Sequence, residues 1–324
     1  MELNEANQDR HHPWLLISSH GAPHAKQFFY SISEDRFHAT SIPELCNKCV
    51  LASAYGWLVL VDHDTDDCCL WNPVSMDKIE LPELDCSSIY NRCVLSKPPT
   101  DPECHILFNS TTTLHRAFLQ IGDDEFVILS STNNVTEVCL STVGSFQGKI
   151  YGIVSISNQF VTLNFVGKNL EIRPMIMEGG QPWEIPIMSP TWVALRKEYL
   201  IESPCGELLL VREMFSCSFL HEGLDFRVFR LDINQMKCVK LDNIGNQAIF
   251  LDRLTEEGVN GGVCYYSDGI KPNSIYYTAT NSRNLHIYDL NDRSTTFLLP
   301  CPAARRSQSM NYWVEYETFQ NLIK

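Results

Sequence analysis

The sequence has no long apolar run, and none of its segments approaches the ~20 apolar residues that a membrane-spanning helix needs. Residues 1–12 are polar and acidic, so they show neither the apolar segment of a secretory signal nor the arginine-rich composition of a transit peptide. Helical periodicity is nearly absent from the first 300 residues. These absences exclude a membrane span and a helical fold, and they predict a soluble protein that stays inside the cell.

Basic residues are scarce. The chain has 25 Lys and Arg against 39 Asp and Glu, which gives a formal net charge of −14 at pH 7. Because an acidic surface repels phosphate groups, we expect no nucleic-acid partner and no anionic membrane partner. The acidity is spread along the chain, which is also typical of proteins that are charged simply for solubility.

Cysteine is plentiful, but its pattern does not indicate disulfides. The 13 cysteines are odd in number and follow no framework of regular spacing. Together with the missing secretory signal, this predicts free thiols in a reducing compartment. The expected localisation is therefore cytoplasmic, nuclear or both.

Motifs for catalysis are also missing. The sequence contains no Gly-x-Ser-x-Gly and no glycine-rich phosphate loop ahead of a helix. Glu256 and Glu257 are adjacent carboxylates in a polar loop, which solvation explains better than acid–base work. We therefore predict no catalytic residues and no cofactor, and the sequence favours a binding protein over an enzyme without excluding the latter.

Two segments resemble metal sites and fail the test of spacing. Asp62–Asp67 begins like a calcium loop, but Asp67 stands where such a loop needs Gly, and Pro73 stands where it needs Glu. The second segment, Cys46-x-x-Cys49, has no partner pair at ligand spacing. We interpret the first as a solvated β-turn and the second as structural thiols, so no metal ligand is predicted.

Short apolar runs bounded by Asp, Asn, Gly, Ser and Pro fill most of the chain, and their length and spacing predict an antiparallel all-β fold. The expected strands include 14–19, 27–32, 57–61, 68–71, 79–81, 105–108, 117–121, 126–129, 149–154, 160–165, 207–211, 226–231, 274–278 and 285–288.

These strands fall into repeats. Trp57–Leu84, Phe226–Asn243 and Ser274–Pro302 share an aromatic-bearing strand, a polar turn and a last strand that ends in Leu-Pro or Leu-Asp. This layout predicts the blades of a single β-propeller. About six four-stranded blades are expected, with seven left open, and the boundaries fall near 14–45, 48–86, 90–140, 143–188, 191–245 and 247–302.

The two ends of the chain depart from the regular repeat. The first unit shows only three clear strands, and the C-terminal segment could supply the fourth and close the ring. Residues 311–324 suit a strand followed by a short C-terminal helix. We expect residues 1–13 to form a disordered N-terminal tail and residues 14–324 to form the β-propeller domain.

The segment Cys49–Leu84, with Gly-Trp-Leu, Trp-Asn-Pro and Ile-Glu-Leu-Pro in order, resembles the signature blade of the plant "domain of unknown function 295" family, the KIB-type β-propeller. Phe226–Asp252 is similar to the family's second signature, and Ile287–Pro302 to its closing blade. The resemblance covers roughly residues 14–305 and implies a propeller.

The resemblance also implies a role. Many family members carry an F-box ahead of the propeller and resemble substrate receptors of Skp1–cullin–F-box ubiquitin ligases. Residues 1–13 leave no room for an F-box, so a Skp1-type adaptor is not expected to bind directly, although a link to the ligase through another protein stays open. The leading hypothesis is a protein-interaction propeller with a protein partner and unknown partner-binding residues. The alternative is a small-molecule-binding or enzymatic propeller that uses its central funnel.

Overall fold

The computed structural model describes most of the chain. The described residues are 12–19, 27–62, 64–65, 67–84, 90–111, 113–129, 138–178, 192–217, 222–252, 261–278, 284–298, 309–314 and 319.

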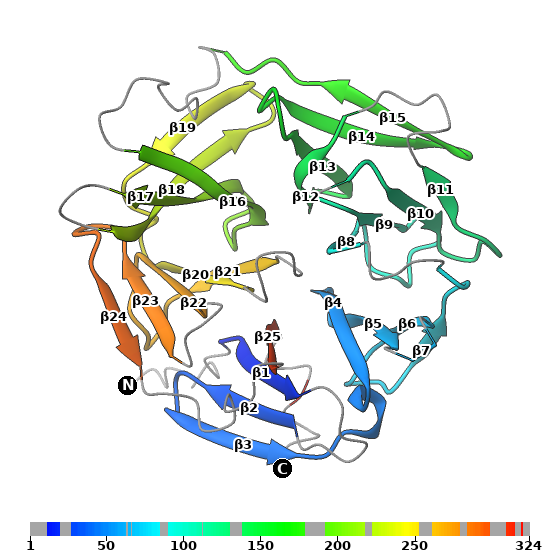
Figure 1. Ribbon diagram of the computed structural model, residues 1–324, viewed down its shortest axis with the longest axis horizontal. Helices are drawn as coiled ribbons and strands as arrows, with labels where there is room; N and C mark the ends of the chain where they lie inside the picture. The colour runs from blue at the N-terminus through cyan, green and yellow to red at the C-terminus, as the bar shows by residue number, and fades with distance from the viewer. Residues whose placement is uncertain are drawn as a thin grey trace, which may run out of the picture.

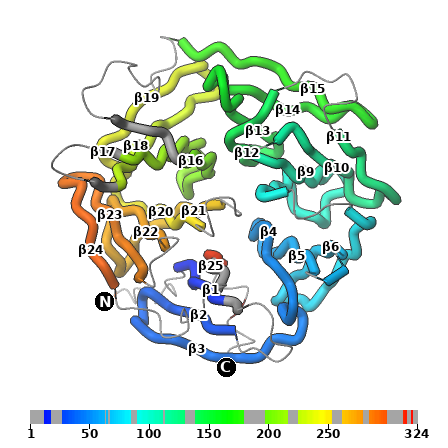
Figure 2. Tube along the Cα trace, viewed as in Figure 1, coloured from blue at the N-terminus to red at the C-terminus, as the bar shows by residue number. Residues whose placement is uncertain are grey.

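Six β-sheets stand around a central channel like the blades of a propeller (Figure 1). The predicted single all-β propeller is confirmed, and the structure selects six blades over seven. The trace in Figure 2 runs once around the ring, and its red C-terminal strand returns to the blue N-terminal blade.

The first three blades each contain four strands, which are named in order from the channel outwards. Blade 1 contains β25 (Ser309–Val314), β1 (Trp14–Ser19), β2 (Gln27–Ser31) and β3 (Arg36–Thr40). Blade 2 contains β4 (Lys48–Ala54), β5 (Trp57–Asp62), β6 (Cys68–Trp71) and β7 (Lys78–Glu80). Blade 3 contains β8 (Arg92–Leu95), β9 (His105–Asn109), β10 (Arg116–Gln120) and β11 (Val127–Leu129).

The remaining blades continue around the ring. Blade 4 contains β12 (Leu140–Phe146), β13 (Lys149–Val154), β14 (Phe160–Val166) and β15 (Asn169–Pro174). Blade 5 contains β16 (Trp192–Glu202), β17 (Leu208–Cys217), β18 (Glu222–Asp232) and β19 (Lys237–Leu241). Blade 6 contains β21 (Gly262–Tyr266), β20 (Gln247–Leu251), β22 (Ser274–Thr278), β23 (Leu285–Asp289) and β24 (Thr295–Leu298).

Blade 6 corrects the prediction of four strands in every blade. After β20 the chain forms a hairpin with β21, which takes the innermost place, and then returns to place β22 parallel to β20. The other strand pairs around the ring are antiparallel. A parallel neighbour needs a crossover rather than a tight turn, and β21 lies between β20 and β22 in the sequence.

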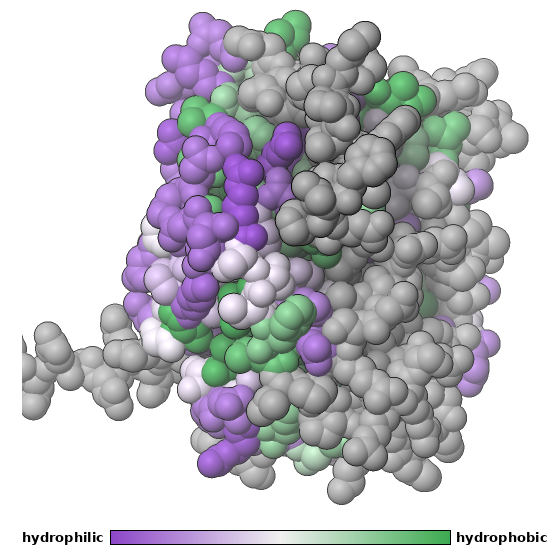
Figure 3. Space-filling view, turned by 60° about the vertical axis from the view of Figure 1, so that its left-hand side comes forward, coloured by the Kyte–Doolittle hydropathy of each residue, from purple (hydrophilic) through white to green (hydrophobic). Residues whose placement is uncertain are grey.

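Burial decreases from the middle strands of a blade to its outermost strand. The inner strands β5 and β6 are almost entirely buried, whereas the outermost strands β3, β7 and β19 alternate between exposed and half-buried positions. On the face shown in Figure 3, the coloured side chains are mostly hydrophilic, with smaller hydrophobic areas between them. The outer edge is therefore solvated, which protects it against pairing with another sheet.

Apolar side chains fill the space between neighbouring blades. One cluster joins blades 1, 2 and 3, and four more join blades 3 with 4, 4 with 5, 5 with 6 and 6 with 1. Each blade thus buries both of its faces against its neighbours, which is the reason the inner strands read as apolar runs.

The C-terminal strand closes the ring. β25 pairs with β1 over six residues, from Trp14 opposite Val314 to Ser19 opposite Ser309, and it completes blade 1. The prediction that this segment supplies the missing strand is confirmed. The predicted C-terminal helix lies outside the described residues except for Phe319, whose ring packs 4.8 Å from that of Phe29.

At the other chain end, residues 1–11 of the predicted tail lie outside the described residues, whereas His12 and Pro13 are buried beside β1. The one described helical segment with defined bounds is a 3-10 turn, η1 (Pro43–Leu45), which links blade 1 to blade 2. No described helix is long and apolar enough to cross a membrane.

Replacing Trp313 should test the closure. Its side chain is 1% exposed in the cluster between blades 6 and 1, and its indole N–H donates to the carbonyl of Leu251 at 3.1 Å. We expect Trp313→Ala to lower the free energy of unfolding by about 3–5 kcal/mol, because it leaves a cavity at the seam. Urea denaturation measures this change.

The matched control is Phe297→Ala on the outermost strand β24, where the ring is 63% exposed. This variant should change stability by no more than about 0.5 kcal/mol. If both variants lose the same free energy of unfolding, the contacts of Trp313 at the closure do not stabilise the ring more than an exposed side chain does.

Candidate functional site: the central channel

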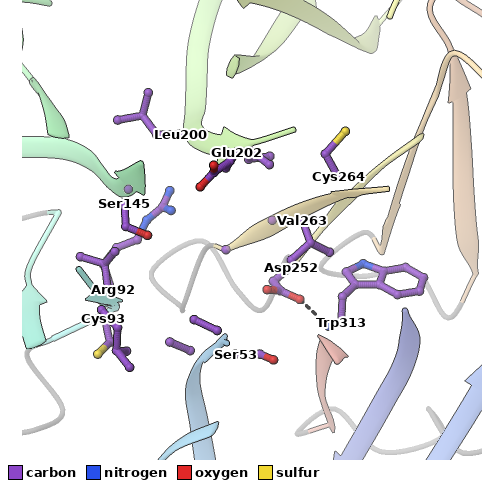
Figure 4. Close-up of a pocket in the computed structure, with 18 of the residues that line it drawn as sticks. Ser53, Arg92, Cys93, Ser145, Leu200, Glu202, Asp252, Val263, Cys264 and Trp313 are labelled. Atoms are coloured by element: carbon purple, nitrogen blue, oxygen red, sulfur yellow. Dashed lines mark hydrogen bonds between the residues drawn. The ribbon is translucent and has the colours of Figure 1, made fainter. Parts of the chain in front are cut away.

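A cavity of about 420 Å³ lies in the central channel (Figure 4). Its walls come from the innermost strand of every blade, namely β25, β4, β8, β12, β16 and β21, together with the residues that adjoin them. Gly144 on β12 allows two of these strands to approach closely, because a Cβ there would stand 2.6 Å from the Cβ of Leu200 on β16.

The innermost strands are irregular where they meet the second strand of their blade. The pairing register shifts by one residue at Leu51 in β4, at Ser141 in β12 and at Arg196 in β16. Bulges of this kind re-aim side chains and are frequent next to functional sites. At the β12 bulge, Ser141 donates a hydrogen bond to the carboxylate of Glu198 on the neighbouring blade.

Within the part of the chain that the structure describes, three charged residues line the cavity among many apolar ones: Arg92, Glu202 and Asp252. They come from blades 3, 5 and 6, which are far apart in sequence (Figure 4). A few polar groups that converge on a mostly apolar concave wall are typical of a ligand site.

Arg92 is 5% exposed on β8. Its Nη2 donates to the backbone carbonyl of Glu198 at 2.5 Å, and its guanidinium carbon lies 5.4 Å from the centre of the Tyr199 ring, a cation–π contact. The Nε–H is buried and has no acceptor among the described residues. Burial lowers the pKa of Arg92 to about 10, so the side chain still carries its charge at neutral pH.

The carboxylate of Glu198 forms an ion pair with another arginine. Its Oε1 lies 2.8 Å from Nε of Arg212, and both side chains are almost fully buried. Arg212 also donates to Oδ1 of Asn158 at 3.3 Å. A buried ion pair with extra hydrogen bonds holds its elements in one geometry, and this pair fixes the carbonyl that anchors Arg92.

Asp252 follows β20 and is partly exposed to the channel. Its Oδ1 accepts the backbone N–H of Trp313 at 2.6 Å, so the carboxylate also ties blade 6 to the closing strand. Gly261 leaves room for the other oxygen, since a Cβ there would lie 2.6 Å from Oδ2. Loss of solvation raises the pKa of Asp252 to about 7, against the opposing effects of the Trp313 N–H and the charge of Arg92.

Glu202 and Tyr55 lie where the cavity reaches the turns that end the innermost strands. Burial raises the pKa of Glu202 above its usual value. Tyr55 occupies the β4–β5 turn at φ +55°, is 41% exposed, and donates its hydroxyl to the carbonyl of Ser96 at 3.2 Å. The turn residues Ser203 and Pro204 line the cavity nearby.

The thiols on the wall are poor nucleophiles. Burial raises the pKa of Cys264 to about 12 and that of Cys93 well above its ordinary value. Because the thiolate is the reactive form, the arrangement favours binding over covalent chemistry at these two residues.

The segment Asp62–Asp67 forms a turn, as its spacing predicted. Oδ1 of Asp62 accepts the backbone N–H of Asp64 at 2.9 Å, and Thr65 donates its hydroxyl to Asp67 at 2.6 Å. The part of the chain that the structure describes holds no group of three His, Cys, Asp or Glu side chains arranged for a metal ion.

The two cysteines of the Cys46-x-x-Cys49 segment have separate partners. The thiol of Cys46 donates to the carbonyl of Ile42, and Cys49 lies 3.1 Å from the hydroxyl of Tyr312. Their structural role is thus consistent with the sequence interpretation. All ten cysteines that the structure describes in full are free.

The arginines in the aromatic-rich strand β18 do not line the cavity. Arg230 pairs with Glu207 at 3.1 Å, and Arg227 lies 3.8 Å from Asp225. β18 is the third of the four strands of its blade, so these arginines lie neither on the innermost strand nor on the outermost one.

Sequence reasoning predicts none of the charged residues in the channel. Arg92 begins a four-residue strand with a single aliphatic pair, and Asp252 ends a stretch that the sequence marks only by its family resemblance. One feature of the sequence could have indicated them, namely a charged residue directly at the end of an apolar strand. A charged side chain that is buried there needs a partner or has a functional role.

The fold and the cavity define a six-bladed propeller whose channel holds a mostly apolar cavity. A family model described as the KIB1-4 β-propeller matches residues 29–289, and the chain belongs to this family. The resemblance inferred from the sequence is therefore confirmed.

Curated relatives come from Arabidopsis thaliana. An F-box/kelch-repeat protein is 24% identical over 275 residues, covering 82% of this chain and 70% of that protein. An F-box protein is 30% identical over 96 residues, covering 30% of this chain and 24% of that protein.

Among solved structures, a chain of a nidogen/laminin complex matches 93% of this chain and 97% of its own length, with 12% identity and a TM-score of 0.46. A luciferin-regenerating enzyme matches 93% of this chain and 86% of its own length, with 13% identity and a TM-score of 0.38.

The raised pKa of Asp252 predicts how stability depends on pH. The folded chain keeps this proton up to about pH 7, whereas an unfolded chain releases it near pH 4. Between these values the folded state binds more protons, so Asp252 lowers the free energy of unfolding as pH rises through the window. Asp252→Asn keeps an acceptor for Trp313 and removes the titration. Its melting temperature relative to the parent should therefore be higher at pH 8 than at pH 5, by at least ~2 °C.

The control is Asp64→Asn in the exposed β5–β6 turn. Its melting temperature relative to the parent should be the same at both pH values. If the melting temperature of Asp252→Asn differs from that of the parent by the same amount at both pH values, the pKa of Asp252 is not raised.

Proposed function

We propose that this propeller is a protein-binding module. The observation that carries the proposal is membership of the KIB1-4 β-propeller family, whose curated relatives include F-box and F-box/kelch-repeat proteins. A closed ring of packed blades supports turns on a rigid scaffold, and such turns suit recognition of another protein.

We extend the proposal to the role implied by the family resemblance. The propeller would hold the substrate of a ubiquitin ligase, and it would do so in the cytoplasm or the nucleus. The support is the F-box in the names of the Arabidopsis relatives. The chain spans less than a third of one of these relatives, so the activity of a whole relative is carried over only as a proposal.

Exposed apolar side chains suggest which end of the ring meets the partner. Tyr55 in the β4–β5 turn, and Val74 and Met76 in the β6–β7 turn, are 41%, 52% and 48% exposed. Successive antiparallel strands reverse direction, so these two turns lie at the same end of blade 2. Tyr55 at this end also lines the channel cavity.

The test is a comparison of variants. The double variant Tyr55→Ala with Met76→Ala removes two exposed apolar side chains and should abolish most recovery of a stoichiometric protein partner in affinity purification from plant cells. Loss of two such contacts at an interface centre typically costs at least ~2 kcal/mol, or about 30-fold in affinity. Mass spectrometry with quantified peptides measures the recovery.

The matched control is Ile156→Ala. Ile156 is 93% exposed in the β13–β14 turn, which joins the second and third strands of its blade and so lies at the other end. Recovery should be unchanged. If no partner is recovered by the folded parent, or if both variants behave alike, the proposed end or the proposed function is wrong.

A further inference from the structure

The channel cavity has the size and the construction of a small-molecule site. Its volume of about 420 Å³ falls in the range of ligand pockets in proteins. Its walls are strands held in register by their blades, so the polar groups are fixed before a ligand arrives, which reduces the entropy lost on binding.

Arg92 points to a ligand with a hydrogen-bond acceptor. Buried donors nearly always have partners, yet the Nε–H of this 5% exposed side chain has none among the described residues. The guanidinium is held by the Glu198 carbonyl and the Tyr199 ring, and neither of these neutralises its charge. A carboxylate from a ligand would supply both an acceptor and the opposite charge.

Asp252 and Glu202 point to a donor on the same ligand. Within the described part of the chain, the carboxylate of Asp252 accepts a hydrogen bond from Trp313, although a carboxylate can accept about four. Both carboxyl groups line the cavity together with Arg92, and the charges of Arg92 and Asp252 interact. A cationic amine would satisfy the carboxylates.

A ligand with only a negative or only a positive charge would not match the charged groups of this wall. A simple anion would meet two carboxylates, and a simple cation would meet the guanidinium. We propose that the channel cavity binds a small zwitterionic molecule of the amino-acid or short-peptide type, with its carboxylate at Arg92, its ammonium at Asp252 and Glu202, and its apolar part against the strands. Tyr55 belongs both to this cavity and to the exposed turns of blade 2 proposed for a protein partner. The charged groups lie on blades 3, 5 and 6, so the proposal does not depend on those turns.

Calorimetric titration of the full chain tests the ligand class. The probes are the common free amino acids and a set of dipeptides such as leucylleucine, each compared with its N-acetylated form and its C-terminal amide. We expect saturable one-site binding of at least one free probe. Blocking either end should weaken that binding by about tenfold or more. If no free probe binds below ~10 mM, or if blocked and free forms bind equally, the proposal is overturned.

Variants of the wall test the assignment of each end. Asp252→Asn should weaken binding of the free probe by about tenfold or more and leave binding of its N-acetylated form unchanged. Arg92→Gln should weaken binding of the free probe by about as much and leave binding of its C-terminal amide unchanged. Arg116→Gln is the control, because Arg116 is 3% exposed on β10 and does not line the cavity. If Arg92→Gln does not fold, Asp252→Asn decides the matter. Unchanged binding in Asp252→Asn, or an equal loss in Arg116→Gln, refutes the site.

Discussion

Closure of the ring by β25 is the constraint on which the rest of the structure depends. Six blades that pack face to face leave two free faces until the last blade meets the first. Pairing of β25 with β1 joins the C-terminal segment to the N-terminal blade by backbone hydrogen bonds. The seam also receives the Trp313 side chain, and an open ring would expose this apolar surface to water. Closure therefore stabilises every blade, and not only the one it completes.

The closing contacts and the channel chemistry use the same residues. Asp252 holds the Trp313 backbone and also lines the cavity, with Gly261 leaving space for its second oxygen. A carboxyl group with a pKa near 7 is a cost to the fold at neutral pH. Groups of this kind are concentrated at functional sites, where function rather than stability explains them.

The fold could be predicted in detail because its signal is local. Strands at Cys68–Trp71, Lys149–Val154 and Ser274–Thr278 coincide with the apolar runs read from the sequence. The five strands of blade 6 could not be predicted, because a parallel neighbour depends on a crossover that has no fixed turn signature. The site could not be predicted either, since Asp252 and Trp313 meet across 61 positions of the sequence.

The added strand β21 connects these features. By taking the innermost place in blade 6, it brings Gly262 and Cys264 to the channel wall, and its neighbour Gly261 accepts the backbone N–H of Asp252. A four-stranded blade with β20 innermost would lack this hairpin and the carboxylate's enclosure. The departure from the regular repeat therefore shapes the part of the channel wall that holds Asp252. In a propeller, an irregular blade is a good place to look for function, because a regular repeat alone gives no reason to place an aspartate at the channel wall.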